Sequence, residues 1–98
     1  TELVTYEDLQ ISPRGRANED IEAGFFELDG QVPCQTDGGL KCFGHPIAAT
    51  GLRMTYECYK QLQGKAGERQ IKDPKLALTH NLGGFPGMAV ASVAIFGT

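Results

Sequence analysis

The sequence GGLKCFGHPIAATG, residues 38–51, decides the fold because a glycine-rich loop gives way in it to a helix. Pro46 suits the first turn of a helix, where its missing backbone N–H is not needed. Beyond Pro46, apolar residues recur at three- and four-residue spacing, and Gly64 is a typical helix stop. These apolar residues are Ala48, Leu52, Tyr56, Tyr59 and Leu62. We therefore predict one main helix over residues 48–63.

Two apolar segments after this helix predict a pair of strands. Leu76 to Thr79 is short and apolar, as expected of a buried strand, and Ala89 to Phe96 is rich in β-branched residues. The glycine-rich segment HNLGGFPG, residues 80–87, is predicted to be the loop between them. Antiparallel strands packed with one main helix place the chain in the α/β class.

The first part of the chain is polar and rich in turn signals. Tyr6 to Leu9 predicts a helical turn, and Pro13 to Asn18 predicts a loop. Phe25 to Leu28 predicts a short strand, and residues 35–46 predict a second loop. A chain of 98 residues is long enough for one domain and one modest core, so we expect a single domain over residues 1–98.

Composition excludes several function classes. The 98 residues are 41% hydrophobic and carry a formal net charge of -3. No Lys/Arg run suggests nucleic acid or an anionic membrane as partner, and no apolar run reaches the roughly 18 residues of a membrane span. An odd number of cysteines favours free thiols in a reducing compartment, so we expect a cytoplasmic protein. The acidic, polar start is unlike a signal peptide and lacks methionine, so we expect a fragment or a processed product.

His45 ends the glycine-rich loop directly before the predicted helix. The partial positive charge of a helix N-terminus disfavours a second positive charge on the imidazole ring. A neutral imidazole can take a proton from a nucleophile or donate an N–H to a developing oxyanion. The alternative is a histidine that only caps the helix.

His80 follows the predicted buried strand and begins the segment HNLGG. Glycine-rich backbone can direct N–H groups at an anion, so His80 and the N–H groups of Leu82 to Gly84 could line an active site. The alternative is an ordinary hairpin turn.

Cys42 and His45 have the Cys-x-x-His spacing of a zinc half-site, but a structural zinc site needs four ligands and no second pair is present. We therefore expect no metal. Cys42 could instead be a nucleophile assisted by His45, although a small buried cysteine is the commoner case.

Residues 38–54, GGLKCFGHPIAATGLRM, resemble a C-terminal thiolase motif: a glycine pair, a short spacer and then Gly-His-Pro-x-Gly-Ala-Thr-Gly. HNLGG, residues 80–84, resembles the second C-terminal thiolase motif. Its His-Asn pair is the form found in sterol-carrier-type thiolases and their archaeal relatives, in place of Cys-x-Gly. The segments YEDLQISPRG, FFELDG and KQLQGKAGERQI look like the same branch. The resemblance implies part of the C-terminal half of a thiolase-like fold.

The resemblance also implies a chemistry, which is acyl transfer between coenzyme A thioesters through an acyl-cysteine intermediate. The substrate would be an acyl-CoA, with no resident cofactor. A thiolase is several times longer than this chain and its nucleophilic cysteine lies in the other half. We therefore expect the chain alone to be inactive, and to form homo-oligomers or pair with the rest of a thiolase. The alternative is a non-catalytic interaction module that completes a partner polypeptide; a ketosynthase relative fits the motifs less well.

The resemblance assigns roles residue by residue. His45 matches the histidine that activates the cysteine thiol and helps hold the thioester oxygen. His80 matches the position of the second catalytic cysteine. Backbone N–H groups near Leu82, Gly83 and Gly84 would contribute to a second oxyanion hole. Cys42 does not match the nucleophile, so the resemblance removes it as a catalytic candidate.

Four positions depart from the family pattern, and one of them is Leu82, which stands where ordinary thiolases have glycine. Ala48 stands where the first motif has glycine. In the lead-in to that motif, Gln35 and Asp37 stand where asparagine and serine are common.

Overall fold

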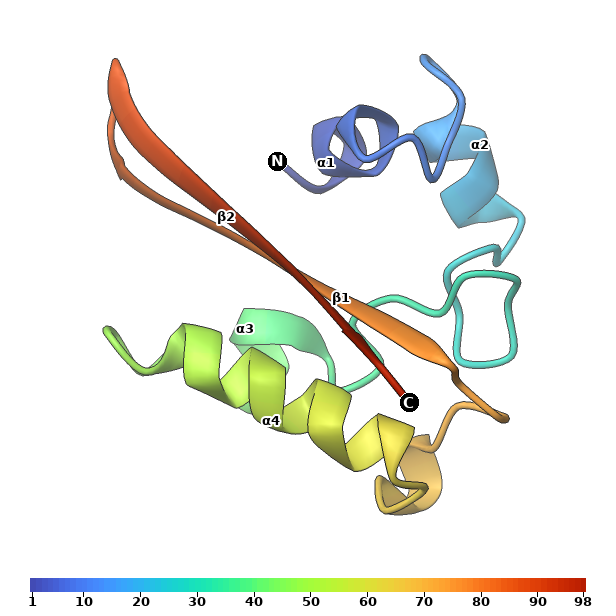
Figure 1. Ribbon diagram of the computed structural model, residues 1–98. Helices are drawn as coiled ribbons and strands as arrows, with labels where there is room; N and C mark the ends of the chain where they lie inside the picture. Colours follow the sequence, from blue (N-terminus) through green and yellow to red (C-terminus); the bar gives the residue numbers. More distant parts are fainter. The chain divides into compact units, whose positions relative to one another are not determined.

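The computed structural model describes all 98 residues, which fold as two compact units, Thr1–Thr36 and Asp37–Thr98 (Figure 1). In chain order the elements are α1 (Glu2–Asp8), α2 (Ala17–Glu22), α3 (Gly39–Phe43), α4 (Thr50–Leu62), the short 3-10 helix η1 (Gly67–Arg69), β1 (Leu76–Phe85) and β2 (Met88–Gly97). Helices together with one antiparallel sheet confirm the predicted α/β class. The single domain over residues 1–98 stays a prediction.

The first unit is built on a small aromatic core. Tyr6 of α1, Ala17 of α2 and Phe26 are buried, and the Tyr6 and Phe26 rings stack with centroids 4.0 Å apart. The Tyr6 hydroxyl donates a hydrogen bond of 2.7 Å to Glu2 Oε1, which also accepts one of 2.8 Å from Gln35 Nε2. Burial raises the pKa of Tyr6, and the hydrogen bond to Glu2 raises it further.

The predicted strand over Phe25–Leu28 is wrong. This segment forms successive turns, in which the Phe25 N–H donates to the Asp20 carbonyl and the Glu27 N–H donates to the Gly24 carbonyl. A strand needs a partner for its N–H and C=O groups, and here local turns satisfy several of them instead. The aromatic residues that suggested a strand belong to the core, where Phe25 packs edge-on against Phe26.

In the second unit, α4 confirms the main helix predicted over residues 48–63, and Gly64 follows it with a positive φ of 68°. The loop predicted over residues 35–46 needs a correction, because it contains the one-turn helix α3. Gly38 permits that helix: its φ is 85°, and a Cβ there would lie 2.6 Å from the Cβ of Cys42. A side chain at this position would therefore be strained and would also clash.

The sheet is one long antiparallel hairpin. β1 and β2 pair without interruption from Leu76↔Gly97 to Phe85↔Met88. The loop predicted over residues 80–87 is therefore wrong, since β1 continues to Phe85 and only Pro86 and Gly87 lie between the strands. Glycines weaken a strand but do not end it, and two residues suffice for a hairpin turn.

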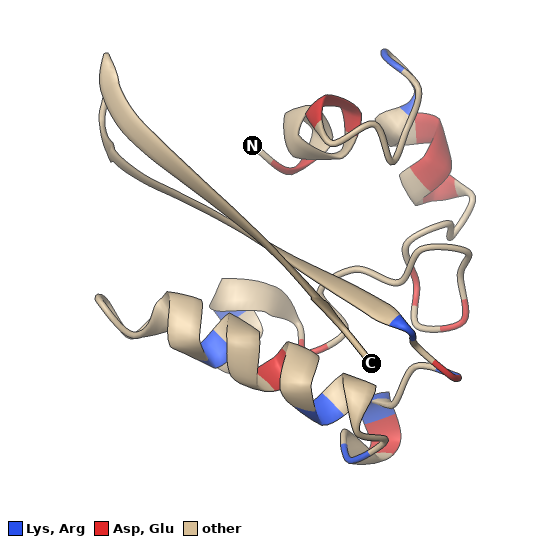
Figure 2. Ribbon diagram, in the orientation of Figure 1, with Lys and Arg blue, Asp and Glu red and all other residues tan.

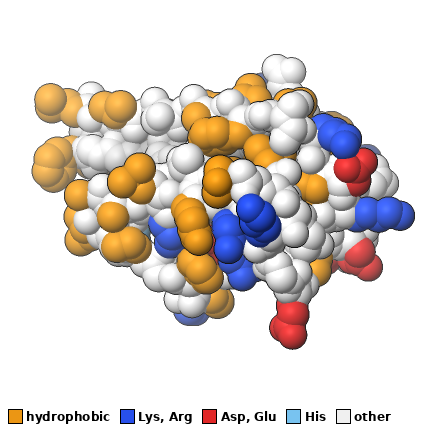
Figure 3. Space-filling view, turned by 60° about the horizontal axis from the view of Figure 1, so that its bottom comes forward, with side chains coloured by type: hydrophobic (Ala, Val, Ile, Leu, Met, Phe, Trp, Pro, Cys, Tyr) orange, Lys and Arg blue, Asp and Glu red, His pale blue; other side chains and the backbone are white.

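Within this unit α4 covers one face of the hairpin and contacts mainly β1. Within the segment predicted to be a buried strand, Thr79 is buried but Leu76 is 72% exposed. Figure 2 shows almost no charge along the hairpin, and Figure 3 shows hydrophobic side chains gathered at the molecular surface. No helix combines the length and apolar character needed to cross a membrane.

Candidate functional site

His45 lies on the short connection between α3 and α4 and is exposed. Its Nδ1 atom is 2.7 Å from Oγ1 of Thr50, the first residue of α4. The ring is thus held through one nitrogen at the start of the helix, which leaves Nε2 for a reacting group. The residue therefore does not simply cap α4 through its side chain, because its ring bonds another side chain rather than a backbone N–H.

The connection itself is a tight turn. The Pro46 carbonyl accepts hydrogen bonds of 2.9 Å from the Ala49 N–H and 2.9 Å from the Thr50 hydroxyl. Ala48 has a φ of 69°, in the left-handed region that favours glycine. This is the position at which the family motif has glycine, and the backbone here has a glycine-type conformation although the residue is alanine.

Asp37 fixes the other end of the loop that leads to His45. One carboxylate oxygen accepts a hydrogen bond of 2.9 Å from the Gly39 N–H, in the first turn of α3. The other forms an ion pair with the Arg53 guanidinium on α4. Both side chains are largely buried, with exposed fractions of 7% for Asp37 and 12% for Arg53. The start of the loop is therefore tied directly to the helix that follows it.

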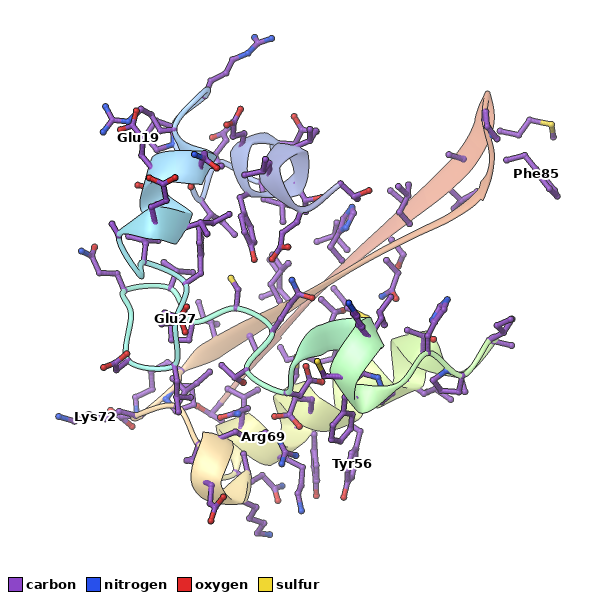
Figure 4. All side chains as sticks on the ribbon, turned by 180° about the vertical axis from the view of Figure 1, so that it is seen from behind. Glu19, Glu27, Tyr56, Arg69, Lys72 and Phe85 are labelled. Carbon is purple, nitrogen blue, oxygen red and sulfur yellow. The ribbon has the colours of Figure 1, made fainter.

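A second ion pair extends this contact along α4. Arg69 of η1 donates two hydrogen bonds to the Glu57 carboxylate, 2.9 and 2.8 Å long (Figure 4 labels Arg69). These bonds raise the pKa of Arg69. The guanidinium groups of Arg53 and Arg69 lie 5.0 and 5.4 Å from the centre of the Phe43 ring, so α3 contributes cation–π contacts to both.

His80 and its neighbour Asn81 point to opposite faces of β1, because successive side chains of a strand alternate. A Cβ on Gly51 would lie 3.8 Å from the Asn81 side-chain oxygen, so Asn81 is on the face against the start of α4. His80 is therefore on the open face, where it pairs across the hairpin with Val93. Within this unit Asn81, rather than His80, lies beside the start of α4, where Thr50 contacts His45.

The predicted oxyanion donors lie in the strand rather than in a loop. Leu82, Gly83 and Gly84 of β1 pair with Ala91, Val90 and Ala89 of β2. In an antiparallel pair only alternate residues use their N–H groups toward the partner. The remaining N–H groups of β1 point to its outer edge, where a ligand could meet them. Phe85 marks the exposed tip beyond them (Figure 4).

Thr50 and Asn81 are the site residues that sequence reasoning missed. Thr50 belongs to the motif around His45, but it follows His45 by five residues and the sequence alone gives it no role beyond that of an ordinary helix residue. A signal for Asn81 was present in the alternation of β1, which places neighbours on opposite faces. Because a loop is predicted over residues 80–87, this alternation was not applied to Asn81.

Comparison with known proteins identifies the family. A family model described as thiolase C-terminal domain-like matches residues 1–98. An acetyl-CoA acetyltransferase of Methanothermobacter thermautotrophicus is 37% identical over 91 residues, which make up 93% of this chain and 24% of that protein. Sterol carrier protein 2 of Bos taurus is 42% identical over 82 residues, 84% of this chain and 15% of that protein. Benzoylsuccinyl-CoA thiolase subunit BbsB of Thauera aromatica is 31% identical over 84 residues, 85% of this chain and 22% of that protein.

The chain spans a quarter or less of the length of these relatives. The match nevertheless extends over the whole chain and confirms the resemblance drawn from residues 38–54 and 80–84. The chain belongs to the thiolase family, in which it corresponds to the C-terminal domain-like part.

Proposed function

We propose that this chain forms the C-terminal part of a thiolase-type acyltransferase that acts on acyl-CoA thioesters through an acyl-cysteine intermediate. In this proposal His45 Nε2 takes the proton of a cysteine thiol supplied by the other half of the enzyme. The thiolate attacks the thioester carbonyl, and coenzyme A leaves as a thiolate that is reprotonated. The reaction needs no resident cofactor, and we place it in the cytoplasm on the odd cysteine count alone.

The observation that carries this proposal is the way His45 is held. Its Nδ1 atom is engaged by Thr50 at 2.7 Å, and a base held by a third group is the arrangement used to activate a nucleophile. The backbone N–H groups of Leu82 to Gly84 are proposed to contribute a second oxyanion hole, and His80, on the face of β1 opposite α4, is proposed to line a part of the acyl-binding pocket away from His45. The outer edge of β1 supports this role, because a two-stranded sheet leaves N–H groups available there.

The first test is His45→Gln in the complete thiolase polypeptide that carries these residues. We expect acylation of the nucleophilic cysteine to slow by about a hundredfold or more, because general-base catalysis contributes on that scale. Release of coenzyme A in a single turnover with acetyl-CoA measures the rate. Asn18→Gln, a change of similar size on α2, is the control and should leave the rate unchanged. Normal acylation in the His45→Gln variant would refute the role of His45.

The second test concerns the 98-residue chain by itself. We expect no thiolase activity, because Cys42 does not match the family nucleophile and no other cysteine of this chain does. The purified chain is incubated with acetoacetyl-CoA and coenzyme A, beside its His45→Ala variant. Turnover above that of the variant would contradict this expectation.

One observation favours a second candidate, a non-catalytic module that completes a partner polypeptide. The face of the hairpin opposite α4 is apolar and open, with Leu82 58% and Val93 50% exposed. Exposed apolar strands of this kind normally meet another protein surface. Sizing the chain by light scattering tests the idea, and a strict monomer in dilute solution would count against it.

A further inference from the structure

We infer that Thr50 is a positioning residue, whose hydroxyl group fixes the proton of neutral His45 on Nδ1 and so leaves Nε2 as the proton acceptor. This inference rests on the proposed function of His45. It adds to that function the group that sets which ring nitrogen reacts.

The argument starts from the single proton of the Thr50 hydroxyl. Oγ1 lies 2.7 Å from His45 Nδ1 and 2.9 Å from the Pro46 carbonyl oxygen. A carbonyl oxygen can only accept, so a hydrogen bond between Oγ1 and Pro46 requires the hydroxyl to donate. Its proton is then used, and the contact with His45 is a hydrogen bond only if Nδ1–H donates to Oγ1.

The opposite arrangement fails at one of the two contacts. If the hydroxyl donated to Nδ1 instead, Oγ1 and the Pro46 oxygen would be two acceptors 2.9 Å apart with no hydrogen between them. Thr50 is buried, with an exposed fraction of 9%, so solvent compensates poorly for a lost bond. Only the order His45 Nδ1–H to Thr50 to Pro46 satisfies both contacts.

This order suits both protonation states of the ring. In the neutral ring Nε2 carries the lone pair that a base needs. When Nε2 has taken the thiol proton, Nδ1–H still donates to Thr50 and Nε2–H can donate to the thioester oxygen. The ring therefore neither rotates nor exchanges tautomers between the two steps.

The experiment compares Thr50→Val with Thr50→Ser in the complete polypeptide. Valine has the shape of threonine without the hydroxyl group, whereas serine keeps it. We expect Thr50→Val to slow cysteine acylation by about ten- to a hundredfold, the usual cost of losing a group that orients a reacting side chain, with little change in KM for acyl-CoA. Thr50→Ser should retain a rate close to that of the parent protein.

Thr55→Val is the matched control. The Thr55 hydroxyl donates to the Gly51 carbonyl at 2.9 Å, so it makes the same bond to the preceding helical turn as Thr50 but does not contact a histidine. A rate loss in Thr55→Val equal to that in Thr50→Val would show a general effect on α4 and overturn the inference.

A second measurement reads the imidazole ring in the unchanged protein and needs a variant only to assign the signals. In the unchanged protein labelled with ¹⁵N-histidine, the His45 ring signals are assigned by their loss in His45→Gln. We expect the neutral ring to carry its proton on Nδ1, and a proton on Nε2 would overturn the inference. If His45→Gln acylates normally, the proposed function fails. If only Thr50→Val acylates normally, the role of His45 stands and that of Thr50 fails.

Discussion

At the scale of single residues, the turn that carries His45 contains a conformation that its sequence does not favour. Ala48 has a φ of 69°, and a side chain in this left-handed region costs about 1–2 kcal/mol. The hydrogen bonds to the Pro46 carbonyl on either side of the turn hold the backbone in place. The turn therefore holds Ala48 in a left-handed conformation at a cost in stability.

Ala48→Gly should increase the free energy of unfolding by about 0.5–1 kcal/mol, because relief of the left-handed strain exceeds the entropy that glycine adds to the unfolded chain. Denaturant unfolding of the chain measures the change. Ala23→Gly is the control: Ala23 is exposed with a φ of -77°, so the same substitution there should lower stability. An equal loss in both variants would mean that Ala48 is not strained.

The sequence indicated where the candidate base lies but not how it is held. The motif over residues 38–51 predicts His45 directly before a helix with Pro46 in its first turn, whereas α4 begins only at Thr50 and residues 46–49 form the turn between them. The bond of His45 to Thr50 depends on the left-handed residue Ala48, which turns the chain back on itself. Alanine gives no local signal for that conformation, so the contact could not be predicted from residue types.

At the scale of elements, the Asp37–Arg53 ion pair connects the start of α3 to α4. Both side chains are largely buried, and Asp37 also binds the Gly39 N–H. Breaking a buried ion pair leaves an uncompensated charge, which costs more than the pair itself contributes.

Asp37→Asn should lower the free energy of unfolding by about 3 kcal/mol, since Arg53 then remains buried without its counter-charge. Asp73→Asn offers a matched control, because the Asp73–Lys75 pair is exposed and should contribute almost nothing. Both variants are compared with the parent chain by urea unfolding. Equal stability of the two variants would contradict the structural role of Asp37.

The elements were predictable where a pattern was long and local. α4 shows helical spacing over its whole length, and its end at Leu62 agrees with the glycine stop at residue 64. The strand predicted over Phe25–Leu28 is wrong because four residues are too few to distinguish a strand from turns whose side chains pack into a core. The predicted strand ends at Thr79, whereas β1 continues to Phe85. Pairing with β2 compensates for the low strand preference of Gly83 and Gly84, and such pairing cannot be read from the local sequence.

At the scale of the whole molecule, the open face of the hairpin is the largest departure from expectation. The face opposite α4 exposes large apolar side chains, including Leu76, Leu82 and Ile95, although Leu76 belongs to a segment predicted to be a buried strand. The chain spans only a small part of its relatives, so we expect a surface outside these 98 residues to cover this face.

We expect the isolated chain to self-associate through this face, and Val93→Lys to reduce the association. Lysine would place a charge at the centre of the apolar surface, beside His80. Molar mass from light scattering over a concentration series measures the effect. Gln31→Lys adds the same charge at an exposed position in the other unit and should leave association unchanged. Equal effects of both variants would indicate simple charge repulsion.

The uninterrupted pairing of β1 with a single neighbour has a consequence for amide hydrogen exchange. Because each strand of a two-stranded ladder directs only alternate N–H groups at its partner, deuterium uptake along β1 should alternate between slow and fast residues. His80 and Asn81, as neighbours, would belong to different classes. A strand added along the outer edge in a larger assembly would convert the fast class to slow, so residue-resolved uptake would report that neighbour directly.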